Sequence, residues 1–429
     1  MTARTLFKNA RLLDPASGLD QRGDLLVADG RIAAIGPRAG TDASGATIVD
    51  CHGHCLAPGL VDMRVELREP GREHEETMES GSAAAAAGGV TTMVALPNTE
   101  PAIDDVALVE FVARRSREIG GVHIRTYAAG TRGLKGREIT ELGLLGAAGA
   151  VAFTDAHTAI ADALVLRRAF SYARTFDALI VQHPEEPSLA AGGHMTEGET
   201  ATRLGLAGIT PAAEVMMVER DLRLVEITGA RYHVAHVSTG AAIEAIRAAK
   251  ARRLPVTCDT APPYFALNET AVGEYRTFAK LSPPLRSESD RRAVVTGLKD
   301  GTIDAIASDH SPHPQDSKRL PFASAEAGVI GLETLLPLTL ELVHNGHLTL
   351  LQALRALSTR PAEILRLPAG RLAEGVPADL VLFDLDRPGR IEIDSFRSKS
   401  KNSPFDGRPV QGCVLKTVVD GRVIFGGDN

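Results

Sequence analysis

Short apolar runs alternate with turns near the N-terminus and again near the C-terminus. In residues 24–36, Asp29-Gly30 separates two apolar runs and predicts a β-hairpin. Residues 378–384 and 414–425 repeat this pattern, and Asp420-Gly421 divides the second of them. Strands from the two ends are therefore expected to meet in one small β-sandwich domain, built from residues 1–58 and 370–429.

Between these ends, strand-like runs alternate with longer stretches of helical period. Residues 75–87 and 239–251, for example, have apolar side chains at helical spacing. Regular alternation over about 300 residues is typical of a (β/α)8 barrel, which we expect in residues 59–369. A doubly wound sheet is the alternative. The barrel is favoured because polar residues follow nearly every strand, where barrel active sites form. The strand-like runs are residues 91–96, 122–127, 150–154, 178–182, 232–237, 256–258 and 303–308.

Composition narrows the class of protein. Apolar residues make up 44% and charged residues 24% of the 429 residues, as in ordinary globular proteins. The sequence contains no run of eighteen apolar residues, so it predicts no membrane span. Residues 1–7 lack the pattern of an export signal. The net charge of −7 argues against a nucleic-acid partner. Four cysteines favour reduced thiols in a cytoplasmic protein, and the absence of Trp disfavours aromatic stacking platforms.

Four polar residues follow different strands in barrel order. They are Asp155, His183, His236 and Asp309. Two imidazoles and a carboxylate are good ligands for zinc-type metals, and a further carboxylate could serve as general base and acid. Each residue alone has a simpler interpretation, as a hydrogen-bonded histidine or a helix-capping aspartate. Their joint placement favours the chemical interpretation.

A second cluster, Cys51-His52-Gly53-His54-Cys55, has zinc-type donors within five residues. The chain there is short and strand-like. We interpret the cluster as packing of the β domain with exposed polar neighbours, and not as a zinc site.

Ten stretches, in order along the chain, match one family. The chain resembles dihydroorotases of the long bacterial type, within the cyclic amidohydrolase superfamily, over essentially its whole length. The matching stretches are Leu67–Gly71, Gly88–Thr92, Leu96–Thr99, Ala152–Asp155, His236–Thr239, Pro283–Arg286, Ser308–His313, Pro321–Phe322, Gly331–Thr334 and Ser398–Phe405.

The resemblance implies a metal-dependent hydrolase that opens or closes the cyclic amide of dihydroorotate, with N-carbamoyl-aspartate as the open form, in pyrimidine synthesis. Asp155 would bridge two metals, His183 and His236 would hold the second, and Asp309 would handle the proton.

The same resemblance assigns substrate binding to Arg68, Asn98 and His313. A planar guanidinium suits a carboxylate because it donates two parallel hydrogen bonds. All three residues are present at the matching positions.

The chain departs from the family where a His-x-His pair would hold the first metal. Arg64 and Glu66 occupy these positions, and residues spaced i, i+2 on a strand point to one face. A guanidinium cannot ligate a metal, because it stays protonated and has no free lone pair. The other departures are Ala261-Pro262-Pro263-Tyr264 for Thr-Pro-His-His, Ser282 for Asn, and Ala325-Glu326 for Ala-Pro.

Arg64 therefore raises the question of what replaces the first metal. Its charge could pair with Glu66, Asp155 or Asp309, and so take the structural place of a cation without Lewis acidity. The second metal site stays formally complete in Asp155, His183 and His236. We accordingly expect at most one zinc per chain.

Three hypotheses follow for function. The favoured one is a dihydroorotase-like protein with weak or no catalysis, acting as a partner of another pyrimidine enzyme, aspartate transcarbamoylase. The second is an active dihydroorotase or related cyclic-amide hydrolase with one metal. The third is a ligand-binding sensor that turns nothing over. Family resemblance also implies a homodimer.

Overall fold

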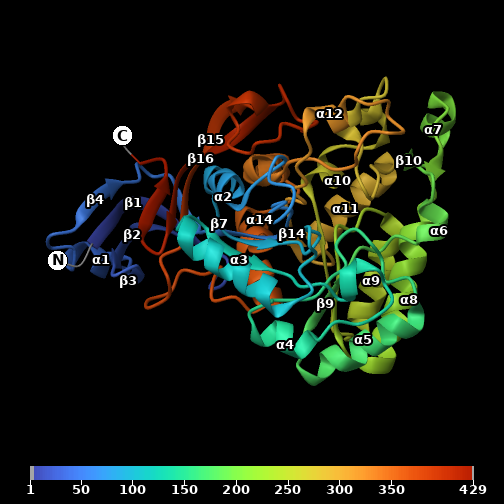
Figure 1. The fold of residues 1–429 in the computed structure, drawn as a ribbon. Coiled ribbons are helices and arrows are strands. Elements are labelled where there is room, and N and C mark those ends of the chain that lie inside the picture. The colour runs from blue at the N-terminus through green and yellow to red at the C-terminus, as the bar shows by residue number, and fades with distance from the viewer. Residues whose placement is uncertain (1–3, 428–429) are drawn as a thin grey trace.

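The two ends of the chain share one sheet. The computed structural model describes residues 4–427, and its largest sheet contains the strands β1 Arg4–Asp14, β2 Leu19–Ala28, β3 Arg31–Ile35, β4 Thr47–Asp50, β5 Cys55–Pro58, β15 Leu380–Arg390, β16 Pro409–Val419 and β17 Arg422–Phe425. Its strand order is β17-β16-β15-β5-β1-β2-β3, with β4 paired to β1. The antiparallel pair β5–β15 joins the ends, with Leu56 opposite Leu382. Figure 1 shows the blue N-terminal strands beside the red C-terminal strands. The expected union of the two ends is confirmed. The proposed domain boundaries stay a prediction, and residues 1–3 and 428–429 lie outside the described residues.

Two tight turns form at the predicted Asp-Gly pairs. Asp29 and Gly30 connect β2 to β3 with φ angles of 52° and 75°. Asp420 and Gly421 connect β16 to β17 with φ angles of 46° and 75°. Positive φ at both central residues matches the right-handed twist of the flanking strands, which is why Asp-Gly is favoured there.

The middle of the chain closes into a (β/α)8 barrel, which confirms the expected fold class. Parallel pairing runs from β6 through β7 to β8, and from β9 through β12 and β13 to β14. Phe153 bridges the two groups by pairing with Ala128 and Ile180, and Val65 pairs with His310 to close the ring. The barrel strands are β6 Leu60–Val65, β7 Val90–Ala95, β8 His123–Thr126, β9 Leu179–Gln182, β12 Arg231–Val234, β13 Val256–Thr260 and β14 Ala305–Ile306.

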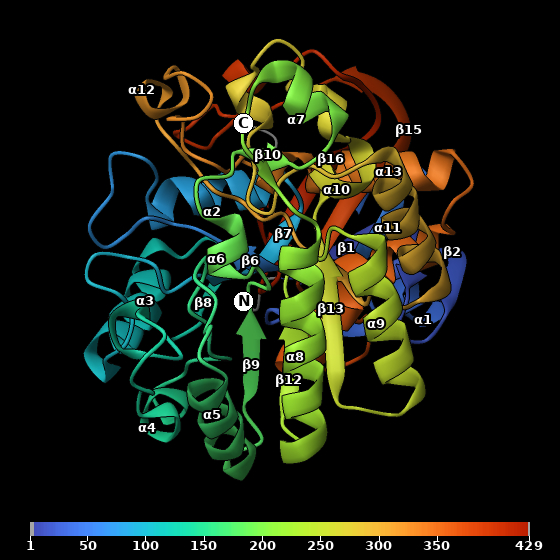
Figure 2. The same cartoon turned by 90° about the vertical axis from the view of Figure 1, so that its right-hand side faces the viewer.

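Helices surround this ring, and Figure 2 shows α5, α8 and α9 side by side on its outer face. Their bounds are α2 Met78–Ala87, α3 Val106–Ile119, α4 Leu142–Ala147, α5 Ala163–Thr175, α8 Ala212–Thr228, α9 Gly240–Ala251, α10 Pro262–Ala266, α11 Glu288–Asp300, α12 Gln315–Lys318, α13 Leu335–His344, α14 Leu350–Leu354 and α15 Arg360–Leu365. The short helix α1 Pro37–Thr41 belongs to the β domain. The remaining single turns are η1 Arg132–Leu134, η2 Glu269–Val272, η3 Thr277–Ala279, η4 Leu332–Thr334, η5 Arg355–Thr359 and η6 Ile393–Ser395.

Local sequence explains how a barrel helix follows its strand. The Thr239 side chain accepts a hydrogen bond from the Ala242 amide and so caps α9 directly after β12. Ala242, Ile243, Ile246 and Ala249 are buried, at the spacing of one helical face. Arg252 ends the helix, so the helix predicted over 239–251 forms almost at its predicted bounds.

A short arm extends from the barrel between β9 and α8. It comprises α6 Pro187–Ala190, β10 Met195–Thr196, α7 Glu199–Leu204 and β11 Gly208–Ile209. The arm stands out at one edge of Figure 1. Its Met195 and Ala201 pack with Val272 and Phe322 in a small apolar cluster, so the arm is anchored to loops at the mouth of the barrel. Among the described residues, no helix is long and apolar enough to cross a membrane.

Candidate active site

A cavity of about 270 Å³ lies at the carboxyl ends of the barrel strands, where barrel enzymes place their active sites. Five predicted site residues line it: Glu66, Arg68, Asn98, Asp309 and His313. The other lining residues are Arg72, His157, Leu281, Ser282, Ser311, Glu326, Ala327, Gly328 and Val329.

Arg64, on β6, is fully buried and forms an ion pair with Asp309. Its Nε donates to Asp309 Oδ1 at 2.7 Å. Its Nη2 lies 3.4 Å from the Ala156 carbonyl oxygen and 3.4 Å from His157 Nδ1. Burial acts to lower the pKa of Arg64, but the charges of Asp309, Asp259 and Glu66 and the hydrogen bond to Asp309 together outweigh it, and the pKa is raised. Of the three carboxylates considered from the sequence, the structure pairs Arg64 with Asp309.

Glu66, two residues further along β6, accepts hydrogen bonds at both oxygens. His157 Nε2 lies 2.7 Å and Ser311 Oγ 2.5 Å from Oε1, and Asn98 Nδ2 lies 2.7 Å from Oε2. Arg68 forms an ion pair with Oε2. Burial acts to raise the pKa of Glu66, but His157 and Arg68 hold it well below its usual range. Glu66 is therefore a carboxylate with no free acceptor facing the cavity.

His157 joins the two ion pairs. A guanidinium only donates, so the contact of Arg64 Nη2 with His157 Nδ1 makes that nitrogen the acceptor. The proton is then on Nε2, which donates to Glu66. Asp309, Arg64, His157, Glu66 and Arg68 consequently form one continuous polar chain across the mouth of the barrel.

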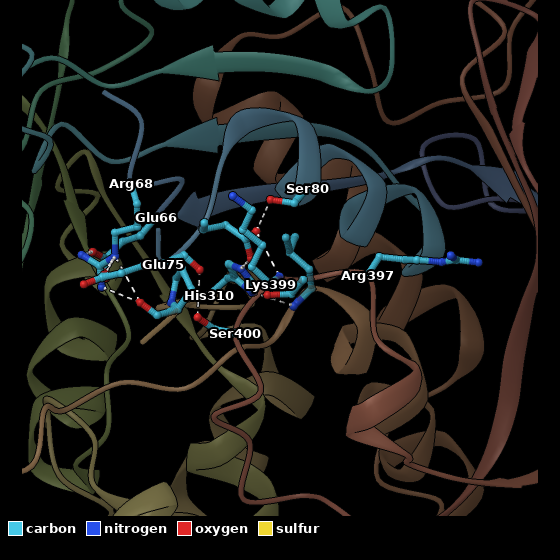
Figure 3. Close-up of polar contacts among 12 residues, drawn as sticks. Glu66, Arg68, Glu75, Ser80, His310, Arg397, Lys399 and Ser400 are labelled. Atoms are coloured by element: carbon cyan, nitrogen blue, oxygen red, sulfur yellow. Dashed lines mark hydrogen bonds and ion pairs between the residues drawn. The ribbon is translucent and has the colours of Figure 1, made fainter. Parts of the chain in front are cut away.

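Arg68 extends this chain toward the C-terminal segment. Its Nε lies 2.9 Å from Glu75 Oε2, and its Nη2 donates to the Pro312 carbonyl at 3.1 Å. Ser400 Oγ donates to the Glu75 carbonyl oxygen at 2.9 Å. Figure 3 shows Glu66, Arg68 and Glu75 turned toward one another, with Ser400 close by. The guanidinium expected to bind a substrate carboxylate is thus already engaged by two protein carboxylates.

The predicted ligands of the second metal are buried and only partly assembled. His183 Nδ1 lies 3.1 Å from His236 Nε2. Burial, and next the charge of Arg64, lower the pKa of His236 well below its usual range, so this imidazole is neutral. Asp155 instead accepts from Thr131, whose amide nitrogen lies 2.8 Å from Oδ1 and whose hydroxyl contacts Oδ2. Burial, opposed by these hydrogen bonds, raises the pKa of Asp155.

This donor set fits a zinc ion only in part. With zinc–nitrogen bonds of about 2.0–2.1 Å, two nitrogens on one tetrahedral ion lie about 3.3 Å apart, close to the separation of His183 and His236. In residues 4–427, however, only His123, Asp379 and Asp420 bring three candidate ligand atoms within 4.8 Å of one another. As arranged, Asp155, His183 and His236 do not form a three-ligand centre. The three residues stay a predicted metal site.

The Cys51–Cys55 stretch also lies outside the group of three candidate ligands formed by His123, Asp379 and Asp420. Burial raises the pKa of Cys51 to about 12 and of Cys55 to about 11, which keeps both as thiols. Cys51 packs in the core of the β domain, and the His52 side chain is 73% exposed. This agrees with the packing interpretation of the cluster.

His313 and Asn98 line the cavity. Asn98 donates to Glu66, as described above, and His313 Nε2 lies 2.9 Å from the Ala327 carbonyl oxygen. Burial and the charge of Arg68 lower the pKa of His313 to about 3. His313 is therefore a neutral imidazole at physiological pH.

Four of the thirteen described non-glycine residues with positive φ lie at this site. Arg68, Ala156, His236 and Asp309 adopt φ angles of 59°, 57°, 37° and 51°, in the left-handed region that non-glycine residues rarely occupy. Such conformations cost free energy and persist where the surrounding contacts determine them.

Sequence reasoning missed three members of the polar chain: His157, Ser311 and Glu75. His157 could have been found from the sequence, because it lies two residues after Asp155, which itself follows the strand-like run of residues 150–154. Ser311 lies inside the matching stretch 308–313. Nothing local distinguishes Glu75, since its role depends on contacts with Arg68 and Ser400, which are distant in sequence.

A closed (β/α)8 barrel with histidines and carboxylates at its strand ends, joined to a β-sandwich from both chain ends, defines the amidohydrolase class. Residues 53–242 match the family described as Dihydro-orotase-like, and residues 233–425 match the Amidohydrolase family. The chain is 47% identical over 424 residues to a dihydroorotase of Anaplasma phagocytophilum, covering 98% of this chain and 94% of that protein. It is 46% identical over 420 residues to a dihydroorotase of Pelobacter propionicus, covering 98% and 99%. The chain belongs to the dihydroorotase family.

Solved structures give the same fold. An L-hydantoinase from Arthrobacter aurescens superimposes with a TM-score of 0.86 at 28% identity, covering 99% of this chain and 96% of that one. A dihydropyrimidinase from Brevibacillus agri superimposes with a TM-score of 0.84 at 23% identity, covering 98% and 94%. The second likeness concerns the fold alone.

Proposed function

We propose that this protein takes the dihydroorotase position in pyrimidine synthesis, binding dihydroorotate or N-carbamoyl-aspartate, with weak or no turnover. Family membership supports this choice of ligand, because the chain matches proteins named dihydroorotase over nearly their whole length. The cavity supports binding, since Asn98, Arg68 and His313 line it at the positions expected for substrate contacts.

The observation that supports reduced turnover is the buried Arg64–Asp309 ion pair. Arg64 Nε occupies Asp309 Oδ1 at 2.7 Å, so this oxygen cannot take a proton without breaking the pair. A metal lowers the pKa of its bound water from near 16 to about 7, whereas a guanidinium offers no coordination site for water. The arrangement supplies positive charge, engages one of the two Asp309 oxygens and offers no site for an activated nucleophile.

The expected consequence is measurable as turnover of dihydroorotate, with and without added zinc. The double variant Arg64→His/Glu66→His should exceed the wild type in kcat/KM by at least about tenfold when zinc is present. Arg38→His, which changes an exposed ion pair with Glu374, is the control and should match the wild type. Wild-type turnover equal to that of the double variant would contradict the proposal of reduced catalysis.

A second candidate is an active cyclic-amide hydrolase with a single metal at Asp155, His183 and His236. The 3.1 Å separation of the two imidazole nitrogens favours it. This candidate requires about one zinc per purified chain, measured by elemental analysis, and loss of both zinc and turnover in His236→Ala. A homodimer and an association with aspartate transcarbamoylase stay predictions.

A further inference from the structure

Two buried lysines, outside the polar chain described above, converge on one segment of the cavity wall. Lys280 follows η3, and Lys318 ends α12. The segment is residues 322–328, which contains neither helix nor strand and contributes three cavity-lining residues. Lys280 Nζ donates to the carbonyl oxygens of Phe322, Ala323 and Ala325 at 2.9, 2.9 and 2.7 Å. Lys318 Nζ donates to the carbonyl oxygens of Glu326 and Gly328 at 2.7 and 3.0 Å.

These contacts account for most of the segment's carbonyl groups. An ammonium group has three N–H bonds, and Lys280 uses all of them on this segment. Backbone carbonyls that lack ladder partners need other donors when they are enclosed by protein. The lysines therefore act in place of secondary structure and fix the path of an irregular segment.

The carbonyl of Ala327 is used differently, because it accepts from His313 Nε2 at 2.9 Å. His313 Nε2 also lies 3.4 Å from Arg68 Nη2, which can only donate. The contact with the Ala327 carbonyl is shorter, and a carbonyl only accepts, so it places the proton of the neutral imidazole on Nε2 and leaves Nδ1 as an acceptor. In the described part of the chain, His313 Nδ1 is buried and has no hydrogen-bond partner. The segment thereby sets the tautomer of a predicted substrate-binding residue.

Close packing makes this arrangement sensitive to the position of the segment. Gly328 has φ +131°, and a Cβ atom there would lie 2.6 Å from Ser311 Oγ and 3.0 Å from His313 Nε2. The Gly328 amide also donates to the Lys280 carbonyl at 2.9 Å. A small shift of the segment would consequently displace the partner of His313.

Burying two ammonium groups is costly, which argues against a role in packing alone. An apolar side chain would fill the same space without the loss of hydration. Burial lowers the pKa of Lys318 to about 7, as expected when an ammonium group loses its hydration. The hydrogen bonds to the segment offset this cost.

We propose that Lys280 and Lys318 are positioning residues for ligand binding, holding residues 322–328 so that the Ala327 carbonyl orients His313 and keeps its Nδ1 free to accept a hydrogen bond. The inference rests on the proposed function, because His313 is taken to contact the ligand. It adds two residues that never touch the ligand themselves.

The test uses the full-length variants Lys280→Met and Lys318→Met, which keep the length of the side chain and remove the donors. Lys299→Met, at an exposed lysine of α11, is the matched control. Calorimetry with N-carbamoyl-aspartate should show a dissociation constant raised at least about tenfold in the first two variants and unchanged in the control. Where turnover is measurable, KM should rise while kcat changes by less than about threefold.

Nitrogen-15 NMR of labelled histidines, with His313 assigned through His313→Gln, gives an independent readout. The wild type should show the Nε2–H tautomer, and both lysine variants should show a mixture of tautomers. If a lysine variant does not fold, Gly328→Ala provides a second way to move the segment. This variant should give the same mixture of tautomers.

Wild-type affinity in both lysine variants, or an unchanged His313 tautomer in them, would overturn the inference. If the wild type fails to bind N-carbamoyl-aspartate or dihydroorotate, the proposed function fails by itself. The tautomer measurement then still decides whether the two lysines position His313.

Discussion

On the β6 side of the barrel mouth, buried charges meet opposite charges, whereas the side formed by β9 and β12 presents two histidines, of which His236 is neutral. Arg64 pairs with Asp309, and Arg68 pairs with Glu66. On the other side, His183 and His236 contact each other, and His236 Nδ1 has no partner in the described part of the chain. On the first side, each of these buried charges is paired with an opposite charge. The second keeps the kind of donors that metals and ligands use.

This difference shows how Arg64 and Glu66 are accommodated on β6 within the barrel fold. A buried guanidinium without counter-charge would be strongly unfavourable, and so would a lone buried carboxylate. Arg64 and Glu66 each find partners that are also present in the family motifs, namely Asp309 and Arg68. His157 then links the two pairs.

The largest expected effect comes from breaking the charged side. Arg64→Met should lower the free energy of unfolding by about 3–5 kcal/mol, because Asp309 is left as a buried charge without its partner. Urea denaturation at pH 7 measures the change. The double variant Arg64→Met/Asp309→Leu should recover most of the loss, and equal loss in both variants would show that the ion pair is not its cause.

The predicted ligands beside the two histidines can be tested through Thr131, which contacts Asp155. Thr131→Val removes the hydroxyl that donates to Asp155 and should cost about 1.5–3 kcal/mol, as expected for a hydrogen bond to a charged group. It should also raise the zinc content per chain, since one carboxylate oxygen becomes available. Thr140→Val is the control: it removes a buried hydroxyl that donates to the Ala129 carbonyl at 2.6 Å and should leave zinc content unchanged. No rise in zinc would contradict the idea that Thr131 withholds Asp155.

A smaller effect, dependent on pH, is expected from His313. Its pKa is about 3 in the folded protein and about 6.5 in the unfolded chain, so the unfolded state binds the extra proton below pH 6.5. Stability therefore falls with falling pH, by about 1.4 kcal/mol at pH 5.5 relative to pH 7.5. The difference in unfolding free energy between wild type and His313→Gln at the two pH values isolates this contribution. A difference that does not change with pH would contradict it.

The smallest effect is expected from an ion pair outside both sides of the mouth. Arg38 and Glu374 form an exposed pair, with side chains 74% and 48% accessible. Arg38→Met should change the unfolding free energy by less than about 1 kcal/mol, because solvent screens the pair. A loss as large as that of Arg64→Met would show that burial does not distinguish the two arginines.

Local pattern was sufficient to predict the architecture. Period and turn chemistry place the strands and the two Asp-Gly hairpins, and polar residues at strand ends locate the mouth of the barrel. Sequence also raised the pairing of Arg64 with Asp309 as one of three options. Choosing among them required the barrel geometry, which brings residues 245 positions apart into contact.

Other parts of the site could not be predicted from sequence. Lys280 and Lys318 look like ordinary surface lysines, because nothing in their neighbourhood shows that a loop will enclose them. The Asp155 carboxylate was expected to face a metal, and its contact with Thr131 depends on a loop that returns to the barrel mouth. Such contacts arise from tertiary packing, which periodicity does not encode.

The C-terminal segment behind the cavity has a consequence for biosynthesis. Asn402 Oδ1 accepts from the His313 amide at 3.1 Å, Asn402 Nδ2 donates to the Ser311 carbonyl at 2.9 Å, and Ser400 supports Glu75. A ribosome makes these residues after all the barrel strands. A chain that ended before residue 398 would contain every barrel strand but would lack these contacts to His313, Ser311 and Glu75.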